Sequence, residues 1–200
     1  MGDQDHEDTH DRREIDGRPR RQRDALRLAS GGEGDVGWVF VHPRCARRRS
    51  EDMAEVETML AAGETEIARD ELVWLLSECP DYLDAHLQLA LIAMEEGDVR
   101  LARGHFGRVH ELGMRAIDAA GGPVPVRYGP PANAAFWEAT KGLVHCLAEP
   151  GRGPVAREIA ARAARLDPTD PLGITAIATR AAAAPTADER PGRRRRRRGK

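Results

Sequence analysis

The side chains best suited to acid–base chemistry in this chain are its histidines, of which there are seven. Four of them, His86, His105, His110 and His145, fall in stretches with helical apolar patterns. A catalytic histidine needs a nucleophile or a carboxylate placed around it in a recognisable arrangement, and no such motif surrounds any of these four. We therefore expect packed or surface histidines, no catalytic residue, no cofactor and a protein that is not an enzyme.

Three cysteines could bind a metal, pair as disulfides or stay reduced. Cys45, Cys79 and Cys146 are odd in number, far apart and lack a C-x-x-C spacing, which favours reduced thiols in a cytoplasm. His42 and Cys45 could share a zinc ion only if Cys79, His145 or Cys146 came near them. Because adjacent helical residues point in different directions, we expect no metal site.

A glycine-rich stretch, residues 32–37, matches the letters G-x-G-x-x-G of a dinucleotide-binding loop. A phosphate-binding loop of this kind follows a strand and opens a helix, whereas the strand-like run Trp38 to Val41 comes afterwards. Glu33 and Asp35 would also repel a pyrophosphate. We expect residues 38–49 to form a short extended lead-in that covers the exposed side of the first helical pair, with Ser50 as the N-cap of its first helix.

Two amphipathic patterns meet within the stretch from Asp81 to Leu112. Apolar residues at helical spacing form one stripe on each side of a polar break: Leu83, Leu87, Ala90, Leu91 and Met94, then Val99, Ala102, Phe106, Val109 and Leu112. Gly97 can end the first helix with a positive φ, and Asp98 can cap the second. The stretch therefore predicts an antiparallel helical hairpin.

The same hairpin recurs on both sides. Gly63 lies 34 residues before Gly97, and each is followed five residues later by an alanine. Gly151 is followed in the same way by Ala156, and Pro80 and Pro168 each stand 17 residues after a turn glycine. Each of these positions has a physical explanation. The glycine allows a tight turn, the alanine is small where two helices touch, and the proline stands where the chain leaves the pair.

This pattern at a period of 34 resembles the tetratricopeptide repeat over residues 50–168. The resemblance implies an all-α domain at 50–184, with three stacked degenerate hairpins at about 50–80, 81–114 and 134–168 and a capping helix at 171–184. Asp52, His86 and Thr140 stand where the family tends to have a large aromatic residue, and only the middle copy keeps Phe106 late in its second helix. An unrelated helical bundle is the alternative.

The remaining segments differ in composition. Residues 1–37 and 185–200 are polar and predict disordered tails. Asp170 and Pro171 predict the start of the capping helix. Residues 115–133 form an insertion whose first part extends a helix and whose prolines favour an extended loop around Tyr128, before Asn133 caps the next helix. Two interpretations stay open for this loop: Tyr128 lines or gates a binding surface, or the loop is a spacer packed on the outside.

Charge is distributed unevenly along the chain. Residues 51–178 hold 21 acidic and 11 basic side chains, so this domain should repel nucleic acid. The 29 arginines against two lysines are typical of a GC-rich bacterial genome. No secretory signal and no apolar run of membrane-spanning length occur, which favours a cytoplasmic protein with no membrane partner.

The resemblance also implies a concave groove lined by the first helix of each hairpin. The candidate groove residues are Met53, Glu57, Leu60, Leu87, Leu91, Met94, Glu95, Lys141 and His145. Lys141 alone does not make the basic clamp that grips a C-terminal carboxylate, so we expect a scaffold that binds a basic or apolar peptide segment of another protein. The alternative is a nucleic-acid or ribosome-associated factor that acts through Arg193, Arg194, Arg195, Arg196, Arg197 and Arg198. A passive, solvated tail is equally compatible with that run of arginines.

Overall fold

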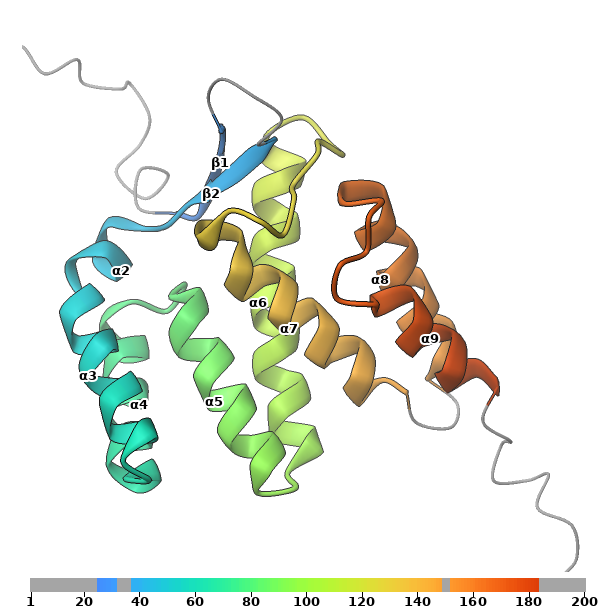
Figure 1. Ribbon diagram of the computed structural model, residues 1–200. Helices are drawn as coiled ribbons and strands as arrows, with labels where there is room; N and C mark the ends of the chain where they lie inside the picture. The colour runs from blue at the N-terminus through green and yellow to red at the C-terminus, as the bar shows by residue number, and fades with distance from the viewer. Residues whose placement is uncertain (1–24, 32–36, 149–151, 184–200) are drawn as a thin grey trace, which may run out of the picture.

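The computed structural model describes residues 25–31, 37–148 and 152–183. This part of the chain is mostly helical, which confirms the all-α fold class. Its elements are β1 (Arg27–Ser30), β2 (Trp38–Val41), α2 (Arg44–Arg48), α3 (Ser50–Ala61), α4 (Thr65–Glu78), α5 (Leu83–Glu95), α6 (Val99–Ala119), α7 (Pro131–Cys146), α8 (Gly153–Leu166) and α9 (Ile174–Ala183). From α3 onward each helix packs against the next one in the chain, and α7 also contacts α5 and α9 (Figure 1).

The first two helical turns have the same backbone structure. Gly63 and Gly97 have φ values of 78° and 79°, and the residue after each donates its N–H to a carbonyl five residues earlier. A positive φ is easy only for glycine, which explains why this residue recurs there. Asp98 accepts a hydrogen bond from the Leu101 N–H at 2.9 Å, so the predicted turn and cap are confirmed. Gly151 lies outside the described residues.

Three predicted helix starts need correction. Ser50 is the first residue of α3 rather than its N-cap, and its hydroxyl donates to the Arg47 carbonyl. The last helix begins at Ile174 instead of residue 171, although the Asp170 carboxylate still accepts from the Ile174 N–H at 2.8 Å. Asn133 lies inside the first turn of α7, which Pro131 opens, so it is not a cap.

The N-terminal strands were not expected. β1 and β2 pair antiparallel, with Leu28 opposite Phe40, so the prediction that residues 1–37 form a disordered tail is wrong for residues 25–31. Of the predicted extended lead-in at 38–49, only residues 38–41 are a strand, whereas Arg44–Arg48 form helix α2. The strand β2 packs on α7, and β1 packs on α6, instead of covering the first helical pair. Phe40 is buried there, with its ring 5.1 Å from that of Phe136. The strand pair therefore closes one end of α6 and α7.

Asn133 joins three segments at that end of the molecule. Its side chain is fully buried, and its Oδ1 accepts from the Phe40 N–H at 3.0 Å. Its Nδ2 donates to the Trp38 carbonyl at 3.0 Å and to the Arg127 carbonyl at 2.7 Å. The amide therefore gives a hydrogen-bond partner to one backbone donor and two backbone acceptors at this end of the molecule.

The loop before α7 is part of the packed structure. Val126 is fully buried, and its N–H donates to the Leu166 carbonyl at the end of α8. The carbonyl of Pro125 accepts from the Trp38 N–H at 2.7 Å, so the loop also lies against β2. The loop is therefore packed against α8 and β2, and its role as part of a binding surface or as a spacer stays a prediction.

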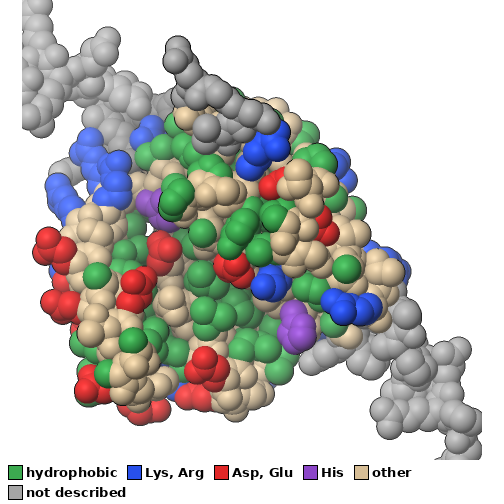
Figure 2. All heavy atoms as spheres, in the orientation of Figure 1, with side chains coloured by type: hydrophobic (Ala, Val, Ile, Leu, Met, Phe, Trp, Pro, Cys, Tyr) green, Lys and Arg blue, Asp and Glu red, His purple; other side chains and the backbone are tan. Residues whose placement is uncertain are grey.

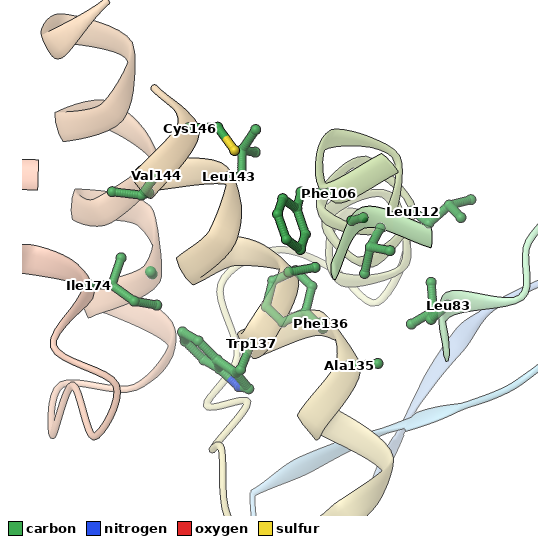
Figure 3. Packing of buried hydrophobic residues seen from close by; sticks show 14 of the residues in the cluster. Leu83, Phe106, Leu112, Ala135, Phe136, Trp137, Leu143, Val144, Cys146 and Ile174 are labelled. Carbon is green, nitrogen blue, oxygen red and sulfur yellow. The ribbon is translucent and has the colours of Figure 1, made fainter. Parts of the chain in front are cut away.

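Helices α6 and α7 touch through two reciprocal contacts between a glycine and a phenylalanine. A Cβ atom placed on Gly113 would lie 2.2 Å from the ring of Phe136, and one on Gly142 would lie 2.5 Å from the ring of Phe106. Each helix thus contributes one glycine and one ring, and Figure 3 shows both rings in the space between the helices. Only a residue without a side chain allows the backbones to come this close.

Two groups of buried side chains form the core. The larger group joins α5 to α9 with the strands, and the smaller one joins α2, α3, α4 and one side of α5. The smaller group contains a disulfide between Cys45 and Cys79, whose Cα atoms are 5.6 Å apart. The prediction of three reduced thiols is therefore wrong; Cys146 is buried and is not part of this disulfide. Because Cys45 and Cys79 are bonded, the cysteines no longer support the prediction of a cytoplasmic location.

Candidate functional site

A groove between α5, α7 and α9 is the candidate functional site. It encloses a cavity of about 380 Å³ with a mainly apolar lining. The lining residues are Leu87, Leu91, Met94, Phe106, Glu138, Lys141, Gly142, His145 and Ile177. Figure 2 shows this face, on which hydrophobic side chains gather between α5 and α7 with charged and histidine side chains beside them.

Helix α5 provides one wall because it is apolar on more than one side. Ala85, Leu89 and Ile92 pack into the smaller core, whereas Leu83, Ala90 and Ala93 belong to the larger one. The stripe Leu87, Leu91 and Met94 lies between these two faces and is left to line the groove. Leu91 is 41% exposed, so part of its side chain faces the groove without a partner from the core.

The floor depends on the close approach of α6 and α7. Phe106 reaches the groove from α6 beneath Gly142, where a side chain would collide with its ring. Phe106 is otherwise buried, at 2% exposure. Ile177, on α9, closes the far side of the cavity. The groove therefore uses four helices that are separated in sequence by as many as 90 residues.

Polar groups of α7 line the groove beside this apolar surface. Glu138 and Lys141 form an ion pair at 3.6 Å, and both line the cavity together with His145. The Tyr128 hydroxyl donates to Glu138 Oε1 at 2.9 Å, and this hydrogen bond to a carboxylate raises the pKa of Tyr128. The proline-rich loop is thus connected to the groove through Glu138.

The structure brings five of the nine predicted groove residues into this cavity: Leu87, Leu91, Met94, Lys141 and His145. Glu95 is exposed at the end of α5 and does not line it. The three candidates on α3 are also elsewhere: Met53 is buried in the smaller core, Leu60 packs against that core, and Glu57 is exposed. Phe106, Glu138, Gly142 and Ile177 were missed, since no local pattern indicates which other helices approach α5.

A second cavity, of about 630 Å³, lies between the loop that contains Tyr128 and the loop before α9. Tyr128, Pro130 and Pro131 line one side, and Asp167 and Thr169 line the other. Asp167 is almost fully buried, and hydrogen bonds from Thr169 and from the Tyr128 N–H outweigh burial and lower its pKa. These contacts hold the loop that contains Tyr128 against the loop before α9.

The N-terminal helices and α5 make one side of the molecule acidic. Residues 50–98 contain 14 acidic side chains and a single arginine, Arg69. Arg69 forms ion pairs with Glu96 and Glu66, and the hydrogen bond with Glu96 is the main reason why its pKa is raised. Acidic side chains are prominent over α3 and α4 in Figure 2, next to the open side of the groove. This side should attract cationic segments.

The histidines show no catalytic arrangement among the described residues. His86 and His105 face each other across α5 and α6, with 3.0 Å between their Nδ1 atoms, and burial lowers the pKa of both rings. His110 stacks on Phe136 and contacts the Thr140 hydroxyl, and burial lowers its pKa to about 4. No group of three or more potential metal ligands gathers in the described part of the chain. This pattern is typical of histidines that pack between helices.

Comparison with protein-family models, with curated proteins and with solved structures gives no match for this chain. None of the helices in residues 25–31, 37–148 and 152–183 is both long and apolar enough to cross a membrane. The groove and the chemistry of its surroundings are therefore the features that bear on function.

Proposed function

We propose that the protein is a noncatalytic scaffold that binds a peptide segment of another protein in the groove between α5, α7 and α9. The observation that carries this proposal is the apolar cavity beside Leu91, a leucine that is 41% exposed although its helix is packed on both sides. Exposed apolar surface bordered by polar side chains is characteristic of sites that bind other proteins.

The size of the cavity suits side chains rather than a whole helix. A volume of about 380 Å³ is near the lower limit of ligand-binding pockets and accommodates one or two large apolar side chains. A partner helix or extended segment would lie across the groove and insert such an anchor. Binding energy at interfaces is usually concentrated in a few anchors of this kind.

Charge favours a partner that is basic next to its anchor. The 14 acidic side chains of residues 50–98 lie on α3, α4 and α5 and around them, and Figure 2 shows acidic side chains over α3 and α4 on the face that carries the groove. Lysine or arginine residues in the partner would lower the repulsion among these carboxylates and increase the association rate at low salt. The resemblance to tetratricopeptide repeats, which resides in the turn glycines Gly63 and Gly97 and their period of 34, supports the same class of function.

A matched pair of leucines tests the proposal. Leu91 and Leu101 are 41% and 44% exposed, but Leu91 lines the groove and Leu101 lies on α6 away from it. Peptides selected from a displayed random library on the wild-type protein should lose affinity by about 30-fold or more on Leu91→Glu, the loss expected for a central anchor site. Leu101→Glu should leave their affinity within about twofold, since surface substitutions away from the contact have small effects.

Two results would contradict the groove as the binding site. One is a set of selected peptides whose affinity is the same for Leu91→Glu and for the wild-type protein. The other is an equal loss with Leu101→Glu, which would indicate a general effect of added negative charge. Circular dichroism of both variants at the assay temperature shows whether they are folded.

A second candidate function follows from the C-terminal sequence. Six arginines at positions 193–198 can bind phosphates by releasing counterions, which suggests an RNA- or ribosome-associated factor. These residues lie outside the described part of the chain. The test is RNA binding as a function of salt: it should weaken steeply and should vanish when the chain is truncated at Pro191. RNA binding that survives truncation would rule this function out.

A further inference from the structure

We propose that His86 and His105 bind a divalent transition-metal ion, such as Cu²⁺, Ni²⁺ or Zn²⁺, between α5 and α6, with water in the remaining coordination positions. Imidazole nitrogen is a preferred ligand for all three ions. The site lies away from the peptide groove, because neither histidine lines that groove.

The geometry of the two rings carries the proposal. The Nδ1 atoms are 3.0 Å apart, the ring centroids are 5.3 Å apart and the ring planes meet at 41°. Two imidazole nitrogens that share one ion at about 2.0–2.1 Å stand roughly 2.9 to 3.4 Å apart, for angles at the metal between 90° and the tetrahedral value. The observed separation falls within this range. To share one ion, the rings have to leave their present N–H···N alignment so that both Nδ1 lone pairs point to one common position, and the ring of His105 makes most of this turn because His86 is held at its Nε2.

The other nitrogen of His86 already has the partner that a metal ligand commonly has. Its Nε2 lies 3.1 Å from the Pro80 carbonyl, and because a carbonyl only accepts, the Nε2 must carry the proton. The neutral ring therefore presents an unprotonated Nδ1 to His105. Metal-bound histidines usually donate their second N–H to a carbonyl or carboxylate in this way, which fixes the tautomer and the ring orientation.

Without a metal, the proton between the rings belongs to His105 Nδ1, which donates to His86 Nδ1. When the ion binds, this proton moves to the Nε2 of His105, and both rings stay neutral with their Nδ1 lone pairs on the metal. The exchange replaces one N–H···N hydrogen bond with two coordination bonds. No oxidant, reductant or further protein group is required.

The neighbouring cavity leaves space for water. It measures about 540 Å³, and its lining consists of both histidines with Asp98, Arg100, Leu101, Gly104 and Arg108. The positive charge of Arg108 is compensated by Asp81, at 2.9 Å, and by Glu111, at 3.4 Å. Because no third histidine, cysteine or carboxylate of the described residues joins the pair, the ion would be exchangeable rather than a permanent part of the fold.

Electron paramagnetic resonance of Cu²⁺ added to the full-length protein tests the proposal. His6 and His10, near the N-terminus, could also bind Cu²⁺, so the measurement uses a His6→Ala/His10→Ala background. One equivalent of Cu²⁺ should show hyperfine coupling to two imidazole nitrogens. The variants His86→Gln and His105→Gln each remove one ligand. Loss of a residue that only supports a metal ligand usually weakens metal binding by roughly 10- to 100-fold, and loss of a ligand itself should weaken Cu²⁺ binding by more than that. The control His145→Gln, on the exposed side of α7, should keep both the affinity and the two-nitrogen signal.

Thermal unfolding provides the second readout. Ni²⁺ should raise the Tm of the background protein and of the His145→Gln control, but not that of either single variant. The proposal is overturned if tenfold excess Cu²⁺ gives no protein-bound signal, or if the signal persists unchanged in both His86→Gln and His105→Gln. Circular dichroism without metal verifies that these variants are folded.

Discussion

Substituting glycine by alanine at two positions of α6 should change stability in opposite directions. Gly104 and Gly113 are both in the interior of this helix, so alanine brings each the same gain in helix propensity, about 1 kcal/mol. A Cβ on Gly104 would have no neighbour within 4 Å, whereas one on Gly113 would lie 2.2 Å from the Phe136 ring. The difference between the two variants therefore measures only the steric effect of the close helix contact.

The surroundings of Phe136 indicate how large the steric destabilisation by Gly113→Ala should be. This ring is fully buried, and the rings of Phe40, Trp137 and His110 lie within 5.7 Å of it, centroid to centroid. It has little room to move away, so overpacking should cost about 2–3 kcal/mol, in the upper part of the usual range. We expect Gly104→Ala to stabilise the fold by about 0.5–1 kcal/mol and Gly113→Ala to destabilise it by about 1–2 kcal/mol.

Urea unfolding followed by circular dichroism measures both free energies, and equal slopes show that the comparison is valid. The double variant Gly113→Ala/Phe136→Leu is the internal check. The smaller side chain should remove part of the clash, so the two substitutions together should cost less than the sum of their separate effects. If Gly113→Ala is as stable as Gly104→Ala, α6 and α7 do not meet as closely as described. The position of Phe106 at the floor of the groove, which depends on the same close contact of α6 and α7, would then also be unexplained.

Three further predictions concern stability. Asn133→Ala should destabilise the fold by at least about 3 kcal/mol, because one backbone N–H and two carbonyls lose their partner. Asn133→Asp should be no better despite its shape, since a carboxylate would face those carbonyls; a urea midpoint near wild type for either variant would be inconsistent with this role. Reduction of the Cys45–Cys79 disulfide, which spans 34 residues, should cost about 3–4 kcal/mol, whereas a Cys45→Ser/Cys79→Ser variant should not respond to dithiothreitol. The pKa of His110, about 4 in the folded protein, lies below the value of about 6.5 in the unfolded chain, so the unfolded state binds the proton more tightly. The stability is therefore complete above pH 6.5 and declines as the pH falls towards 4, by up to about 3 kcal/mol. Unfolding free energies measured across this window should show the decline, and His110→Gln should remove its share of it.

The helices and turns followed from local patterns. Gly63, Gly97 and Asp98 were assigned from spacing alone, because a turn glycine and a cap act on residues within one helical turn. The stripe Leu87, Leu91 and Met94 could be predicted for the same reason, and the structure places all three in the groove.

Contacts between distant segments could not be obtained in this way. Asn133 was interpreted as a cap, but its partner Phe40 lies 93 residues away. The register that sets Gly113 against Phe136 depends on how the chain returns after the inserted loop, which no local pattern encodes.

The disulfide is a different case, since a usable signal was present. Cys45 precedes the first helix of a hairpin and Cys79 ends the second. An antiparallel pair brings these two ends together, so the predicted topology already placed the thiols near each other. The general rarity of disulfides in the cytoplasm favours reduced thiols and so conflicts with this geometry.

Helix α5 belongs to both groups of buried side chains and is the main connection between them. The helices α3 and α4 pack on only one of its sides, and the disulfide lies wholly within their group. The helices α3 and α4 should therefore open as one unit, and their amide protons should exchange with solvent together, before those of α6 and α7. A ligand that binds α5 would then stabilise the contact between two cooperative units. Its binding should slow amide hydrogen exchange well beyond the residues it touches.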